Sequence, residues 1–498
     1  MTVFLVGAGP GDPGLLTVRG AEVLASADVV VFDRLSVASL LELAPPGAER
    51  ISVAKSAGRA VMPQEEINQL LVERGRRGQR VVRLKGGDPF VFARGGEEAA
   101  ALRDAGVAYE VVPGITSAIA VPAYAGIPVT LRHSSTSFTV ITGHEDPGKG
   151  GELDWDAVAR LGGTIIILMG VGRIRAIVDR LLAGGLAPDT PAAAVRWGTR
   201  PEQSTVRARL ADLPDQPLEA PSVIVIGAVA ATNLEWFESR PLFGRRVVVT
   251  RPAHQASALA APLRAVGAEP VVVPTIEITD PDDGGAALAA ATSDLSAYAW
   301  VVLTSANGAE RFCAALRDGR DLAGVRLAAI GPGTADALAR HHLVADLVPE
   351  RFVAESLLEA FPPPTSTSAP GSGAGRVLLA RAAVARDVLP EGLRAMGWTV
   401  DVVEAYRTVP VVPSPDDRAL VGGADAVTFT SSSTVDQWVA AFGADAVPPL
   451  VACIGPVTAA TAKGHGIRVD VVAPVHTIDG LVDALVAHVA PRHPPDPH

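Results

Sequence analysis

The sequence predicts an α/β protein of more than one domain, in which helices cover short, buried and mostly parallel strands. Short β-branched runs alternate with helical stretches along the chain, and continuous apolar runs are typical of strands buried on both faces of a sheet. Hydrophobic residues make up 48% of the 498 residues and charged residues 19%, so each domain can bury a core. A chain of this length is expected to form about two to four domains.

The first domain is expected to span residues 1–240. Its strand candidates, in chain order, are VFLVGA, DVVVFD, RVVRLKGGDP, YEVVPG, FTVITG, TIIILMG and SVIVIGAV. The glycine-rich loop VGAGPGDPG follows the first strand and lets backbone N–H groups approach a ligand closely. Because Pro10 and Pro13 interrupt this loop and the GxGxxG spacing is missing, a nicotinamide dinucleotide site is rejected. Taken alone, the loop is more simply interpreted as a tight strand-exit turn.

A second series of strands predicts a second α/β domain over residues 243–490. It runs through RRVVVTRP, WVVLTSANG, VRLAAIGPG, RVLLARA, DAVTFTSSS and LVACIGPVT. Two motifs recur within it: TSSSTVDQW follows TSANGAERF by 126 positions, and IGPVTAATA follows IGPGTADAL by 124 positions. Nearly equal offsets predict two duplicated lobes, each a small parallel sheet, with a cleft between them. We expect a flexible loop at 362–375 and a disordered tail at 491–498.

Charge and cysteine content exclude several function classes. The net charge of −11 and the 4% aromatic content argue against a nucleic-acid partner, which needs an excess of Lys and Arg. Cys313 and Cys453 lie in apolar segments without metal-ligand spacing, so we expect buried, inert thiols, no disulfide and no metal site. No basic leader opens the chain and no apolar run approaches about 18 residues, so a cytoplasmic protein without a membrane span is expected.

Several strand-exit motifs of the first domain occur together. They are VGAGPGDPG, FDRL, AKSAG, LKGGDPFVFARGGEE, VVPGITSA, GIPVT and ILMG. In this combination residues 1–240 resemble the tetrapyrrole methylase family, and within it uroporphyrinogen-III C-methyltransferase. The resemblance implies a two-lobed tetrapyrrole methylase fold that holds S-adenosyl-L-methionine and forms a homodimer. It also implies methyl transfer to C2 and C7 of uroporphyrinogen III, which gives precorrin-2.

The same resemblance implies particular site residues. Glycines expose backbone groups to the cofactor, a carboxylate suits a ribose hydroxyl or an ammonium group, and a thioether is a soft neighbour for adenine. The implied cofactor contacts are Pro10, Gly86, Gly87, Asp88, Val91, Thr116, Ser117, Met169 and Gly198. Asp33 and Lys55 match the family's proton acceptor and proton donor. The alternatives are a helix cap or salt bridge for Asp33, and a solvated lysine or substrate-carboxylate clamp for Lys55.

The residues of the second domain alone indicate only a two-lobed ligand binder. Serine and threonine at its strand exits would cap the following helices, and helix starts from two lobes would suit a polycarboxylate. The order of VVVTRP, PTIEI, TSANG, AIGPGTA, EAYRT, TSSST, IGPVTA and HTIDGLVDAL resembles uroporphyrinogen-III synthase. That fold implies one lobe of 245–274 plus 409–490 and another of 279–403, with PTIEI and EAYRT crossing between them. Candidate substrate-binding residues are Arg251, Thr304, Ser305, Thr334, Ser431, Ser432 and Thr458, and a structural ion pair is the alternative for Arg251.

Together the two resemblances imply a bifunctional enzyme that acts on small tetrapyrroles. The second domain would cyclise hydroxymethylbilane with loss of water and inversion of the last ring, and Tyr406 would assist departure of the hydroxyl. An aromatic ring packed in the hinge is the alternative for Tyr406. The first domain would then methylate the product towards sirohaem or cobalamin.

Two rival hypotheses stand beside this one. The methyltransferase could be fused to a non-catalytic tetrapyrrole-sensing module, which a basic helix-turn-helix appendage would favour, and we find no such appendage. The first domain could instead methylate a different corrinoid intermediate, although Asp33, Lys55 and the GGDPF context argue against this.

Overall fold

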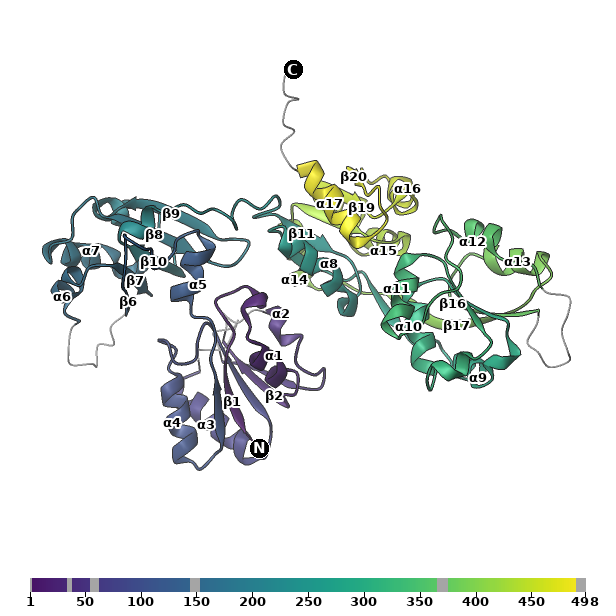
Figure 1. Ribbon diagram of the computed structural model, residues 1–498, viewed down its shortest axis with the longest axis horizontal. Coiled ribbons are helices and arrows are strands. Elements are labelled where there is room, and N and C mark those ends of the chain that lie inside the picture. The colour runs from purple at the N-terminus through teal and green to yellow at the C-terminus, as the bar shows by residue number, and fades with distance from the viewer. Residues whose placement is uncertain (1, 34–37, 54–61, 144–152, 365–374, 490–498) are drawn as a thin grey trace, which may run out of the picture. The chain divides into compact units, whose positions relative to one another are not determined.

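The computed structural model describes residues 2–33, 38–53, 62–143, 153–364 and 375–489 (Figure 1). Its contacts divide the chain into two compact units. Unit 1 comprises Met1–Arg245 with Val266–Glu269, and unit 2 comprises Arg246–Ala265 with Pro270–His498. None of the helices in the described ranges is long and apolar enough to cross a membrane.

The first sheet of unit 1 is parallel, with strand order β3-β2-β4-β1-β5. Its strands are β1 (Val3–Gly7), β2 (Val29–Phe32), β3 (Glu49–Ser52), β4 (Val81–Lys85) and β5 (Tyr109–Val112), and its helices are α1 (Val18–Leu24), α2 (Ala38–Leu41), α3 (Gln64–Arg76) and α4 (Gly95–Asp104). Val3 and Leu5 enter one hydrophobic cluster, whereas Phe4 and Val6 enter another. Because successive strand residues point to opposite faces, both faces of the sheet are covered, which explains the continuous apolar runs.

The second sheet of unit 1 is mixed, with strand order β6-β7-β10-β8-β9. Only β6 and β7 pair in parallel, and the other neighbours are antiparallel. The strands are β6 (Phe138–Thr142), β7 (Thr164–Leu168), β8 (Pro191–Arg196), β9 (Ser204–Arg209) and β10 (Ser222–Ile226), and the helices are α5 (Ser117–Tyr124), α6 (Trp155–Arg160) and α7 (Ile174–Ala183). All strands predicted for this half form, but β3, β8 and β9 were not predicted.

Unit 2 contains two further sheets. The first has the order β12-β11-β18-β19-β20, and the second has the order β13-β17-β16-β14-β15. The first sheet and its helices are β11 (Arg246–Val249), α8 (Ala253–Ala265), β12 (Glu269–Val272), α14 (Pro415–Gly422), β18 (Ala426–Phe429), α15 (Ser432–Phe442), β19 (Leu450–Cys453), α16 (Pro456–Gly464), β20 (Val471–Val472) and α17 (Ile478–Val489). The second comprises β13 (Ile276–Thr279), α9 (Ala286–Ser293), β14 (Trp300–Leu303), α10 (Ala306–Ala315), β15 (Arg326–Ala329), α11 (Pro332–Arg340), α12 (Ala354–Ala360), β16 (Arg376–Ala382), α13 (Val388–Ala395) and β17 (Thr399–Pro410).

The two lobes of unit 2 repeat each other in detail, as the spaced motifs predicted. Equivalent polar contacts occur about 124 to 126 positions apart: the Asp346 carboxylate accepts from Leu327 N and the Asp470 carboxylate from Val451 N, and Glu310 contacts His341 as Asp436 contacts His465. Each lobe also packs a ring against the N-cap glycine of the helix that starts with Gly-Pro. Phe352 lies against Gly331, and His476 lies against Gly455. The duplication therefore extends from the strands to individual side chains.

The two segments expected to cross between the lobes lie side by side. Ile276–Thr279 of PTIEI pairs antiparallel with Arg407–Pro410, which follow Tyr406 of EAYRT on β17. Both belong to the sheet of the second lobe, which runs from Ile276 to Pro410. Antiparallel pairing lets one strand leave the lobe beside the strand that returns.

Candidate functional site

A cavity of about 540 Å³ lies in unit 1, a volume ordinary for a small-molecule site. Its walls are the loops after β1, β4, β7 and β8, the start of α5 and the start of β10. Every residue predicted as a cofactor contact lines it: Pro10, Gly86, Gly87, Asp88, Val91, Thr116, Ser117, Met169 and Gly198. Asp33 lines it as well, and Lys55 lies outside the described residues. The structure thus brings together side chains from positions far apart in the sequence.

Glycines allow three loops to meet at this cavity without intervening side chains. Gly87 has φ +68°, and its N–H donates to the Gly9 carbonyl at 2.8 Å. A Cβ on Gly7 would lie 2.6 Å from the Gly87 carbonyl oxygen, and a Cβ on Gly114 would lie 2.3 Å from the same atom. Because real Cβ atoms do not approach so closely, only glycine fits here, and backbone polar groups stay accessible at the wall.

Asp88 joins two of these loops. Its Oδ1 accepts from Phe90 N at 2.8 Å, and its Oδ2 accepts from Gly114 N at 3.0 Å. Each carboxylate oxygen has a further lone pair, so the group can still accept from a ligand. The carboxylate therefore shapes the cavity in addition to lining it.

The cavity lining also contains residues in uncommon backbone conformations. Met169 has φ +55°, Trp197 has φ +48° and Phe92 has φ +50°, and all three line the cavity. Left-handed conformations of bulky residues cost about 1–3 kcal/mol each and cluster at functional sites. A Cβ on Gly198 would lie 2.3 Å from Val121 Cγ1, so the lining at Gly198 packs tightly against α5. Sequence reasoning missed Phe92 and Trp197, because nothing in the sequence marks a left-handed residue other than glycine.

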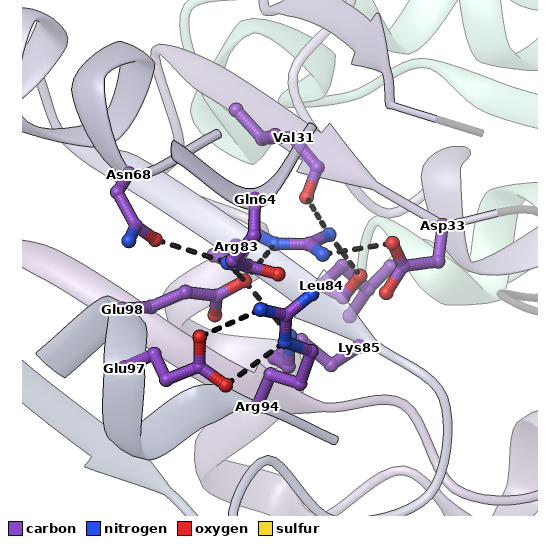
Figure 2. A network of polar contacts seen from close by, with 10 residues as sticks. All are labelled: Val31, Asp33, Gln64, Asn68, Arg83, Leu84, Lys85, Arg94, Glu97 and Glu98. Atoms are coloured by element: carbon purple, nitrogen blue, oxygen red, sulfur yellow. Dashed lines mark hydrogen bonds and ion pairs between the residues drawn. The ribbon is translucent and has the colours of Figure 1, made fainter. Parts of the chain in front are cut away.

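Asp33 belongs to a group of charged side chains at the cavity (Figure 2). Its Oδ1 accepts from Arg83 Nη2 at 2.7 Å, so the salt bridge expected as an alternative role is present. Arg83 also contacts Glu98, which contacts Lys85, and Lys85 lines the cavity. The charged pattern of RVVRLK in a buried strand was the available signal for these residues, and sequence reasoning did not use it.

In unit 2, two of the predicted serines cap helices at strand exits. Ser305 Oγ accepts from Gly308 N at 3.0 Å at the start of α10, directly after Thr304. Ser431 Oγ accepts from Thr434 N at 3.3 Å at the start of α15. Ser432 is linked to the next helix, since its Oγ accepts from Thr461 Oγ1 at 2.8 Å.

The caps predicted at Thr334 and Thr458 were wrong. The N-cap positions are Gly331 and Gly455, both with extended backbone and no side-chain cap, and proline follows each glycine. The threonines lie in the first turn, where they are buried. Because proline pre-sets the first helical residue, these helices start without a side-chain acceptor.

Arg251 and Tyr406 occupy different surroundings. Arg251 Nη2 donates to Gln255 Oε1 at 3.2 Å, and Gln255 in turn hydrogen-bonds to Asn307 on α10. Among the described residues Arg251 makes no ion pair, and burial lowers the pKa of its guanidinium. Tyr406 is 7% exposed within a hydrophobic cluster, and a Cβ on Gly308 would lie 3.9 Å from its Cε1. The Tyr406 ring thus lies at the first turn of α10.

Comparisons with known proteins identify both halves. The family model of tetrapyrrole (corrin/porphyrin) methylases matches residues 2–214, and that of uroporphyrinogen-III synthase HemD matches residues 257–483. The porphyrin biosynthesis protein HemD of Ruminiclostridium josui is 39% identical over 97% of this chain and 97% of its own length. An S-adenosyl-L-methionine-dependent uroporphyrinogen III methyltransferase of Methanosarcina barkeri is 50% identical over 46% of this chain and 91% of its own.

Solved structures are also similar to the first half. The uroporphyrin-III C-methyl transferase from Thermus thermophilus, complexed with S-adenyl homocysteine, is 38% identical over 46% of this chain and 94% of its own, with a TM-score of 0.41. The near full-length match and the two family models agree in order and extent. The chain belongs to the family of the porphyrin biosynthesis protein HemD, and its match to the tetrapyrrole methylases precedes its match to uroporphyrinogen-III synthase.

Proposed function

We propose that unit 2 converts hydroxymethylbilane to uroporphyrinogen III and that unit 1 methylates this product at C2 and C7 to give precorrin-2, with S-adenosyl-L-methionine as the methyl donor. The observation that carries the proposal is the cavity of unit 1, where all the motif residues matched to cofactor contacts meet Asp33. The near full-length relative supports the pairing of the two activities in one chain.

The cavity fits S-adenosyl-L-methionine on chemical grounds. Its glycine-lined loops leave room that a Cβ would fill, Asp88 offers a carboxylate, and Met169 presents an exposed thioether. When bound, S-adenosyl-L-methionine supplies an electrophilic methyl group. The backbone of Gly86 and Gly87 would contact the cofactor directly, and Asp88 would both accept from it and hold the loops in place.

Asp33 is proposed as the proton acceptor. Arg83 engages one carboxylate oxygen, so the other oxygen can accept the pyrrole N–H proton as the ring carbon becomes nucleophilic. Lys55 is proposed as the proton donor on the strength of its motif alone.

Unit 2 is proposed to act mainly by orienting its substrate. Hydroxymethylbilane is a polycarboxylate, and Arg251 is a cation without an acidic partner among the described residues. The strand exits around Thr304, Ser305, Thr334, Ser431, Ser432 and Thr458 offer helix starts to the remaining carboxylates. Tyr406 would donate a hydrogen bond to the departing hydroxyl.

Unit 1 is also proposed to associate with a second copy of the chain. Phe90 and Ile119 expose 56% and 46% of their surface, and Ile115 is exposed nearby in sequence. Exposed large apolar side chains favour an interface. Sedimentation of the full chain should give a dimer, and Phe90→Asp should shift it towards a monomer.

Product analysis tests the function. Incubation of the full chain with hydroxymethylbilane should give the type III isomer without S-adenosyl-L-methionine and a doubly methylated product with it, as seen by chromatography and mass spectrometry. If unit 2 only senses tetrapyrroles, the type I isomer will form at the spontaneous rate, while added uroporphyrinogen III is still methylated. If unit 1 acts on another corrinoid, uroporphyrinogen III will stay unmethylated.

A further inference from the structure

Four charged residues, three of them buried, form a cluster in unit 1, and two of the four, Asp33 and Lys85, line the cavity (Figure 2). Arg83 and Lys85 lie on one face of β4, and Glu98 lies on α4. Asp33 directly follows β2, whose Phe32 pairs with Leu84 of β4. Parallel pairing therefore sets Asp33 beside the end of β4, where both cations project.

Glu98 is the centre of this cluster. Its Oε1 accepts from Arg83 Nε at 3.0 Å and from Lys85 Nζ at 2.9 Å. Gln64 Nε2 lies 3.4 Å from the same oxygen. Arg83 then uses Nη2 to bind Asp33 at 2.7 Å. The orientation of Asp33 thus depends on Arg83, and that of Arg83 depends on Glu98.

The charges balance, and burial makes them interdependent. Glu98 is fully buried, Arg83 is 2% exposed and Lys85 is 3% exposed. Burial lowers the pKa of Lys85, and the neighbouring Arg83 lowers it further. Burial acts in the same direction on Arg83, but the carboxylates of Glu98 and Asp33 outweigh it and raise its pKa. Removing one buried charge therefore disturbs the others.

The cluster does not look optimised for stability alone. Glu98 Oε2 is buried without a hydrogen-bond partner among the described residues, and an unsatisfied buried oxygen is destabilising. Apolar side chains of similar volume often stabilise a core better than a buried ion cluster. What the cluster does achieve is a fixed carboxylate at the cavity wall.

We propose that Glu98 is a positioning residue for methyl transfer: it holds Arg83, which in turn orients the Asp33 carboxylate towards the reacting pyrrole. This inference rests on the methyltransferase function proposed above. Glu98 itself is absent from the cavity lining, so it acts through its neighbours.

A double-mutant cycle in the full chain tests the proposal. Glu98→Gln should lower kcat for uroporphyrinogen III methylation by about 10- to 100-fold, since misplacement of a catalytic group by about 1 Å can cost 100-fold. The Kd for S-adenosylhomocysteine, measured by calorimetry, should change by less than about twofold. In an Asp33→Ala background, Glu98→Gln should have little further effect on residual turnover, because the group through which it acts is gone.

Glu73→Gln is the matched control. Glu73 lies on α3, is exposed, and pairs with Arg77. It should retain the wild-type kcat. If Glu98→Gln fails to bind S-adenosylhomocysteine, Glu98→Asp decides instead, because it keeps the charge but is too short to reach both cations. It should then show the same loss of kcat with cofactor affinity retained.

Three results would overturn the proposal. The first is an unchanged kcat in Glu98→Gln. The second is a double variant in which the separate losses of kcat from Glu98→Gln and Asp33→Ala multiply in full. The third is a loss of S-adenosylhomocysteine affinity as large as the loss of kcat in both Glu98 variants, which would indicate a structural role. If the wild type binds the cofactor but never methylates uroporphyrinogen III, the proposed function itself fails, and this inference fails with it.

Discussion

Two aspartates at one cavity have distinguishable roles at the scale of single residues. Asp88 holds the backbone of Phe90 and Gly114, whereas Asp33 is held by Arg83. Asp88→Ala should therefore raise the Kd for S-adenosylhomocysteine by about tenfold or more, since hydrogen bonds to a charged group contribute about 1.5–3 kcal/mol each. Asp33→Ala should keep this Kd and lower kcat. If calorimetry and turnover show the reverse, the two roles must be exchanged.

Tyr406 offers a second residue-scale prediction. Hydroxymethylbilane closes without help, so the enzyme mainly has to orient the terminal ring, and general-acid assistance contributes about 10²–10⁴-fold. Tyr406→Phe should slow formation of the type III isomer without abolishing it, and should raise the share of the type I isomer. Chromatographic separation of the isomers measures both effects. A wild-type rate and isomer ratio would leave Tyr406 as a packed ring without a chemical role.

The two cysteines should be unreactive in the folded protein. Burial raises the pKa of Cys313 and of Cys453 to about 11. Because the thiolate is the reacting form, only about one thiol in a thousand is ionised at pH 8. A disulfide reagent at pH 8 should react with both thiols only after unfolding. The folded state favours the neutral thiol. The contribution of the two cysteines to the free energy of unfolding should therefore fall as pH rises from about 8.5 towards 11.

Helix starts in unit 2 give a prediction at the scale of elements. Ser305 and Ser431 accept hydrogen bonds as caps, whereas Thr334 and Thr458 follow uncapped Gly-Pro starts. Ser305→Ala and Ser431→Ala should each lower the free energy of unfolding by about 1 kcal/mol. Thr334→Val and Thr458→Val remove no cap, so an increase in KM for hydroxymethylbilane would report substrate contact. Urea unfolding and steady-state kinetics on the same variants separate these effects.

The strands predicted from sequence share one property, which two of the three strands missed in unit 1 lack. Buried strands such as β1 and β7 are continuous apolar runs and could be predicted. β3 and β9 are edge strands with exposed polar residues, and β8 is rich in alanine, which has weak strand preference. A local pattern detects burial on both faces, but it cannot detect pairing at a sheet edge.

The candidate site of unit 1 also has parts that could be predicted from sequence and parts that could not. Its glycine loops could be predicted because glycine is required where backbones approach closely. The cluster around Glu98 could not, because its charged side chains look like ordinary surface residues until the fold places α4 against β4. Three-dimensional contact, rather than residue type, makes Glu98 part of the site.

At the scale of the whole molecule, each of the two units contains several hydrophobic clusters of its own among the described residues. Clusters centred on β1, β4 and β7 belong to unit 1, and clusters centred on β14, β16 and β18 belong to unit 2. Because each unit has its own core, we expect separate unfolding transitions.

Ligand binding should identify which transition belongs to which unit. A ligand at 100 times its Kd stabilises the unit that binds it by about 2.7 kcal/mol, which for a unit of this size raises Tm by about 5–10 °C. S-adenosylhomocysteine should therefore shift one calorimetric transition of the full chain and leave the other in place. Asp88→Ala should reduce that shift to about half or less at the same ligand concentration, because a Kd raised about tenfold leaves the ligand at about 10 times its Kd, where it stabilises by about 1.4 kcal/mol. A single transition that moves as a whole would show instead that the two units unfold cooperatively, and that stabilising one core stabilises the other.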